Sequence, residues 1–219
     1  MAALTLAVPV LAEPEIKEWN TPHSMGCMLL RECKEGVLRV ETVDNIKAAY
    51  PGVDYSGVEE EMTDMLAVFE ELGIEVYLAD AKYFMPRTRG VYSTVGNKFF
   101  LNVSHMYDPE TILEVTRHEG WHAAQDCMAG SLQNSHIAVI HHDGYIPEGY
   151  RLRADVAYGG GPAVPWETEA MWAAEQPYVT ANALRACASR EGKMWDVYPP
   201  TPMTGEWLVN NGYWDGNTK

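Results

Sequence analysis

The sequence predicts an α+β fold in which a small twisted sheet with an edge hairpin packs on one long helix, and a second helix packs against that helix. Three observations predict it. Residues 109–129 carry helix start and stop signals around apolar positions spaced for one helix, residues 90–103 form a pattern of two strands joined by a short turn, and residues 166–175 form a strong helical pattern after Pro165. With 219 residues, 47% of them apolar, the chain is long enough for one domain with a sizeable core.

Shorter elements are expected before the hairpin. Residues 36–43 and 74–79 alternate between apolar and polar side chains, which is typical of strands. Residues 44–50 favour a short helix. A longer helix is expected over residues 56–72, opened by a capping box that starts at Ser56, and its stripe of Met and Leu side chains is expected to face the core.

The order of these patterns divides the chain into three segments. We expect an extended N-terminal arm at residues 1–35, a folded domain at residues 36–190 and a C-terminal tail at residues 191–219 that is rich in proline and aromatic residues and has no clear periodicity. Within the domain, residues 130–165 contain several glycines and are expected to be loop, and a last helix is expected over residues 178–190.

Charge and hydropathy restrict the partners of the protein. The formal net charge of -15 predicts that neither nucleic acid nor an anionic membrane binds, because both would be repelled. The apolar run Ala2–Ala12 lacks a preceding basic segment and is too short to cross a bilayer. We therefore expect a soluble protein without a signal peptide or a transmembrane segment, and the sequence assigns no compartment beyond that.

Four cysteines are present, and none belongs to a C-x-x-C pair that would indicate a structural zinc ribbon. Cys27 and Cys33 are close enough in sequence to form a disulfide, although their spacing does not decide whether they do. For the four cysteines as a set, including Cys127 and Cys187, the sequence favours reduced and partly buried thiols.

The long predicted helix carries the motif H-E-x-x-H at His118, Glu119 and His122. Asp108 followed by proline is a favourable helix start, and Gly130 is a favourable stop. On such a helix the two histidines lie one turn apart on one face, so both imidazoles can reach one metal ion. Glu119 points beside that ion, where its carboxylate can take a proton from a metal-bound water.

This motif, preceded by a strand pair, resembles the zincin-type zinc metallopeptidases, over about residues 89–175. The resemblance implies a zincin-like domain at residues 36–190, Zn²⁺ as the cofactor and His118 and His122 as two of its ligands. It also implies that an extended peptide pairs with an edge strand of the sheet, formed here by Phe99–Val103 or by its partner Val91–Thr94.

A catalytic zinc usually has a third protein ligand. Glu167, followed by Ala170, resembles the E-x-x-A ligand helix of gluzincin-type families, so Glu167 is the third ligand that the resemblance implies. Asp155 is an alternative, because Asp155 and Tyr158 match the D-x-x-Y-G part of the aspzincin motif. Glu169 is a further alternative, but it points about 200° away from Glu167 on a helix, so both cannot bind one ion.

These assignments predict zinc-dependent hydrolysis of peptide bonds in a peptide or protein substrate. Glu119 would act as the general base, and Tyr158 would stabilise the oxyanion. Tyr150, His141 and His142 are alternatives for that second role, and the two histidines are also alternatives as ligands.

Two other classes of protein remain open. The first is a catalytically silent zincin-like subunit of a larger assembly, in which a second copy or another partner contacts the terminal arms. The second is a small module in which the metal only stabilises the fold. An intact Glu119 weighs against both, because a purely structural site does not need that base.

Overall fold

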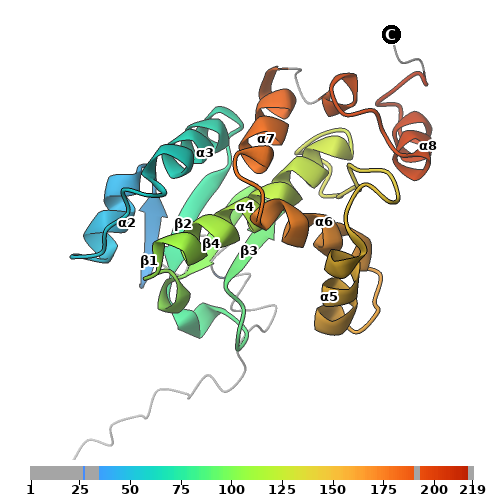
Figure 1. Ribbon diagram of the computed structural model, residues 1–219. Helices are drawn as coiled ribbons and strands as arrows, with labels where there is room; N and C mark the ends of the chain where they lie inside the picture. The colour runs from blue at the N-terminus through green and yellow to red at the C-terminus, as the bar shows by residue number, and fades with distance from the viewer. Residues whose placement is uncertain (1–26, 28–34, 190–192, 217–219) are drawn as a thin grey trace, which may run out of the picture.

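The computed structural model describes Cys27 and residues 35–189 and 193–216, so the predicted arm at residues 1–35 lies almost entirely outside the described residues (Figure 1). The strands are β1 (Val37–Val40), β2 (Glu75–Ala79), β3 (Gly90–Ser93) and β4 (Lys98–Asn102). The helices are α2 (Val43–Ala49), α3 (Glu59–Glu71), α4 (Pro109–Met128), α5 (Glu148–Tyr158), α6 (Val164–Ala174), α7 (Val179–Ser189) and α8 (Pro202–Asn210). The predicted α+β class is therefore confirmed.

The four strands form one sheet in the order β1-β2-β4-β3. β2 and β4 are parallel, whereas β1 and β3 pair antiparallel with their neighbours. The hairpin predicted at residues 90–103 is confirmed as β3 and β4. Of the two strands named as the edge, only β3 lies there. Phe99–Val103 was wrong as an edge strand, because β4 has β2 on its other side and is buried along its whole length.

Helix α4 runs through the middle of the molecule and contacts β3, β4, α6 and α7 (Figure 1). Its start follows the sequence signals: Asp108 accepts a hydrogen bond from Thr111 N at 2.8 Å, and Pro109 is the first helical residue. Just beyond its end, Gly130 has a φ of 111°, a conformation that favours glycine. The predicted helix over residues 109–129 is thus confirmed to within one residue.

Gly120, inside the H-E-x-x-H motif, allows α3 and α7 to approach α4 closely. A Cβ atom at Gly120 would lie 2.9 Å from both Phe69 Cζ and Thr180 Cγ2. Overpacking of a core costs about 1–3 kcal/mol, and the better helix propensity of alanine returns only about 1 kcal/mol. We expect Gly120→Ala to lower the free energy of unfolding in a denaturant titration. Gly149→Ala, on α5 with no atom within 4 Å of the new Cβ, is the control and should not lower it.

Three helix predictions were wrong. Helix α3 begins at Glu59 with Val58 as its N-cap, so Ser56 does not open it with a capping box. Helix α5 lies inside residues 130–165, which were expected to be loop, and it buries only Ala154, so an apolar stripe is missing from its sequence. The tail contains α8, which Thr201 caps by accepting a hydrogen bond from Thr204 N.

The expectation of reduced thiols was also wrong. Cys127 at the end of α4 and Cys187 on α7 form a disulfide across a sequence separation of 60 residues. Both residues are buried, and Cys27 is disulfide-bonded as well. The pairing depends on α4 and α7 lying side by side, which the spacing of cysteines in the sequence does not reveal. Among the described helices, none is both long enough and apolar enough to cross a membrane.

Candidate functional site

The structure brings His118, His122 and Glu167 together, and we call these three residues the His–His–Glu cluster. The two histidines lie one turn apart on α4 with ring centroids 5.0 Å apart, and Glu167 lies on the adjacent helix α6. Glu167 Oε2 is 3.2 Å from His118 Nε2, and Glu167 Oε1 is 3.6 Å from His122 Nε2. One possible ligand atom from each residue lies within 4.8 Å of the other two.

The chemistry of this cluster fits a divalent cation. Burial raises the pKa of Glu167, but the neighbouring imidazoles of His118 and His122 lower it more strongly, so that the pKa lies well below its ordinary value. The buried atom Glu167 Oε2 makes no hydrogen bond of ordinary geometry to the described residues. The two oxygens of this carboxylate face one imidazole nitrogen each, and a metal ion can satisfy the oxygen that lacks a donor. The donor set suits zinc and other transition metals alike.

Glu119 lies beside the cluster without belonging to it. Its side chain is buried, and Oε2 accepts a hydrogen bond from the main-chain N of Tyr92 on β3 at 2.9 Å. Burial raises the pKa of Glu119, while the charges of His118 and His122 lower it. The strand can approach so closely because residue 90 is glycine: a Cβ there would lie 2.9 Å from Glu119 Cγ. Strand β3 and the Glu119 carboxylate therefore lie in contact beside the His–His–Glu cluster.

Tyr158 is the last residue of α5, and its side chain reaches Glu167. Burial, followed by the charge of Glu167, raises the pKa of the Tyr158 hydroxyl, so the hydroxyl keeps its proton. The side chain remains partly exposed, at 44% of its full area. Part of the Tyr158 side chain is therefore open to solvent.

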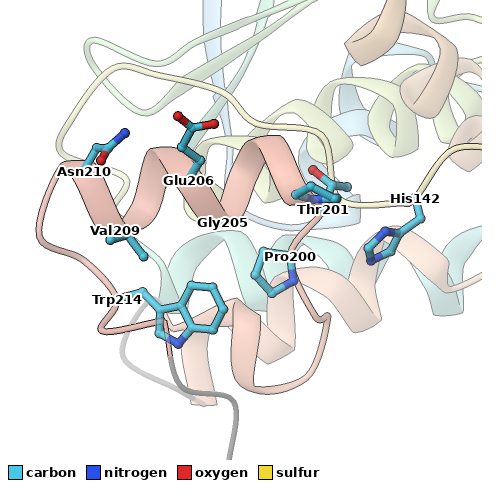
Figure 2. Close-up of a pocket in the computed structure, with 9 residues that line it drawn as sticks. His142, Pro200, Thr201, Gly205, Glu206, Val209, Asn210 and Trp214 are labelled. Atoms are coloured by element: carbon cyan, nitrogen blue, oxygen red, sulfur yellow. The ribbon is translucent and has the colours of Figure 1, made fainter.

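The alternatives for that donor are engaged elsewhere. Tyr150 donates to Glu175 Oε2 at 2.6 Å. The imidazole of His141 stacks on Tyr145, with ring centroids 4.0 Å apart, and burial lowers its pKa to about 4. His142 lines a separate cavity of about 420 Å³ beside α8, shown in Figure 2.

Neither Asp155 nor Glu169, the two acidic alternatives for the third metal ligand, belongs to the cluster. Asp155 lies on α5 and accepts from Arg151 Nη1 at 2.6 Å. Glu169 is buried on a different face of α6 from Glu167, as the rotation per residue predicts. There it accepts hydrogen bonds from Gln125 Nε2 and His141 N. Gln125 was not among the predicted site residues, but its Oε1 lies 2.8 Å from His122 Nδ1. Its spacing, three residues after His122 on one helix, was a usable signal.

No protein-family model, curated protein or solved structure matches this chain.

Proposed function

We propose that this protein is a zincin-like metallopeptidase that hydrolyses peptide bonds with the help of zinc. One observation carries the proposal: a buried carboxylate that is not part of the His–His–Glu cluster, Glu119, lies between that cluster and the edge strand β3. A buried carboxylate, three possible metal ligands and an edge strand thus lie close together, and this supports hydrolysis of an extended chain as the function.

In this proposal His118, His122 and Glu167 hold the zinc ion. The ion, when bound, supplies a Lewis acid that makes a water molecule more acidic and a carbonyl more electrophilic. Glu119 accepts the proton of the attacking water and then donates it to the nitrogen of the leaving amine, so the carboxylate is regenerated. The hydroxyl of Tyr158 donates a hydrogen bond to the carbonyl oxygen as negative charge develops on it.

The edge strand supports a peptide as the substrate. Arg89 O accepts a hydrogen bond from Asn102 N on the side facing β4. Main-chain groups alternate in direction along a strand, so those of Gly90 and Tyr92 point to the side away from β4. The amide of Tyr92 donates to Glu119 on that side, so an extended peptide would pair with the main-chain groups of Gly90, and its main chain would lie next to the base.

The alternative of a silent structural subunit gives Glu119 no role. Burying this carboxylate raises its pKa, which means that the fold loses free energy by keeping it ionised. A glutamine at this position would accept the same hydrogen bond from Tyr92 N without the cost of burying a charge. Perturbed buried carboxylates concentrate at functional sites, and this favours the catalytic proposal.

Metal analysis of purified variants tests the cation site. We expect stoichiometric zinc in the wild type, loss of zinc from His118→Ala and Glu167→Ala because each removes one of three ligands, and unchanged zinc in Asp155→Ala. Peptide cleavage by the wild type should stop on chelation and return with zinc. A wild type that binds no zinc when metal is supplied, or an Asp155 variant that loses it, contradicts the proposal.

A further inference from the structure

We propose that Gln125 and Glu169 act as positioning residues, a pair that holds His122 in the one tautomer whose Nε2 atom can bind a metal. This inference rests on the cation site of the proposed function. It assigns a role to two residues that are not themselves ligands, and it follows from the direction of each hydrogen bond between α6 and α4.

We call the chain of hydrogen bonds from Glu169 through Gln125 to His122 the relay. It begins at Glu169, whose side-chain oxygens are surrounded by donors. Glu169 accepts hydrogen bonds from the main-chain N of His141 at 2.6 Å and of Ile140 at 2.9 Å, from Gln125 Nε2 at 2.8 Å and from Trp121 Nε1 at 3.3 Å. All of these groups are N–H donors, so the two side-chain oxygens of Glu169 are their acceptors.

This carboxylate determines which way the Gln125 amide points. Gln125 Nε2 lies 2.8 Å from Glu169 Oε2 and 3.1 Å from the main-chain carbonyl oxygen of Trp166. Because both neighbours are acceptors, the NH₂ group of the amide must face them. The amide oxygen is thereby directed to the opposite side, where it lies 2.8 Å from His122 Nδ1.

The tautomer of His122 follows from this geometry. An amide oxygen can only accept, so His122 Nδ1 must carry the proton of that hydrogen bond. A neutral imidazole then has its lone pair on Nε2, the atom that faces Glu167 Oε1 at 3.6 Å. Helix α6 thus supplies both an acidic ligand, Glu167, and, two residues later, the carboxylate that orients a histidine on α4.

The substitution Glu169→Gln tests the relay while keeping the size of the side chain. The new amide can donate as well as accept, so the Trp166 carbonyl is the one obligate acceptor that still holds the Gln125 NH₂ group, and the turned Gln125 amide becomes populated. His122 Nδ1 would then face an NH₂ group, which favours the tautomer protonated on Nε2. Loss of an outer hydrogen-bond partner typically weakens metal binding by roughly 10–100-fold, and we expect that loss of zinc affinity in competition with a chromogenic chelator.

A compensating variant separates orientation from simple damage to the core. In Gln125→Glu combined with Glu169→Gln, the carboxylate and the amide exchange places, and the carboxylate at position 125 again accepts from His122 Nδ1. The hydrogen bond to the Trp166 carbonyl is the contact of Gln125 that this exchange does not restore. Zinc affinity should recover in the double variant relative to Glu169→Gln alone. Glu114→Gln, an exposed change on the same helix as His122, is the matched control and should bind zinc as the wild type does.

Nitrogen-15 spectra of the zinc-loaded proteins give a readout that is independent of peptidase activity. In the wild type the proton on His122 Nδ1 should exchange slowly with solvent, and in Glu169→Gln this slow exchange should be lost. Wild-type zinc affinity and an unchanged Nδ1 proton in a folded Glu169→Gln variant would overturn the relay alone. If Glu169→Gln binds zinc more weakly but the zinc-loaded wild type cleaves no peptide, the relay is supported and the proposed function is refuted. A wild type that binds no zinc would overturn both.

Discussion

Glutamine in place of Glu119 is expected to reduce peptide cleavage by the zinc-loaded protein by roughly 10²–10⁴-fold, the contribution typical of a general base. Glu119 is not one of the three clustered residues, so zinc content should not change. The amide oxygen of the variant can still accept the hydrogen bond from Tyr92 N, so the edge strand should keep its position. The variant therefore removes the proton acceptor and little else. Turnover of a peptide library and metal analysis on the same samples check this prediction.

The control for this variant is Glu114→Gln, which makes the same chemical change on the exposed side of the same helix. It should cleave peptides at the wild-type rate. Full activity in Glu119→Gln with zinc still bound would show that Glu119 is not the base. Loss of zinc together with activity would instead mean that Glu119 takes part in holding the metal, and the separation of base and ligands would be wrong.

Replacing both Cys127 and Cys187 by alanine is expected to lower the free energy of unfolding by about 4 kcal/mol, the chain-entropy value for a loop of this length. The disulfide spans 60 positions and joins the end of α4 to α7, so it restricts the unfolded chain strongly. Denaturant titration of the oxidised wild type and the double variant measures the difference. Substitution is preferable to a reductant, because Cys27 is also disulfide-bonded and would be reduced too.

The two single variants separate the effect of the cross-link from the effect of lost packing. Both cysteines are buried, so each alanine also leaves a small void. If the cross-link dominates, Cys127→Ala and Cys187→Ala each lose nearly as much stability as the double variant. If the voids dominate, the losses in the two single variants add up to the loss in the double variant. An unfolding midpoint equal to that of the wild type in all three variants would mean that the disulfide does not stabilise the fold.

The parts of the fold that could be predicted are those with strong local signals. Helix α4 has an N-cap, a proline at its first position and a glycine beyond its end, and the hairpin has two short runs around a turn. Helix α5 could not be predicted from periodicity, because it exposes apolar residues such as Val156 and buries only Ala154. Helix α8 carries a Thr-Pro start signal that was present in the sequence and was overlooked.

The candidate site, like the fold, could be predicted only where local signals were sufficient. The spacing of His118 and His122 on one helix was sufficient to place them together, and the rotation per residue on α6 was sufficient to separate Glu167 from Glu169. The contact between Glu119 and Tyr92 depends on how β3 docks on α4, and the disulfide depends on how α7 does. These are long-range packing outcomes that local sequence patterns do not encode.

Helix α4 is held in the fold by contacts that do not involve the His–His–Glu cluster. Helix α4 is packed against strands on one side and helices on others, and a disulfide joins its end to α7. Small zinc-binding domains unfold when the ion is removed because the ion replaces a core, whereas here the core is complete without it. A metal ion bound at the His–His–Glu cluster could thus be removed and added back while the protein stays folded. Cobalt could then replace zinc, and its visible absorption would report the ligand geometry.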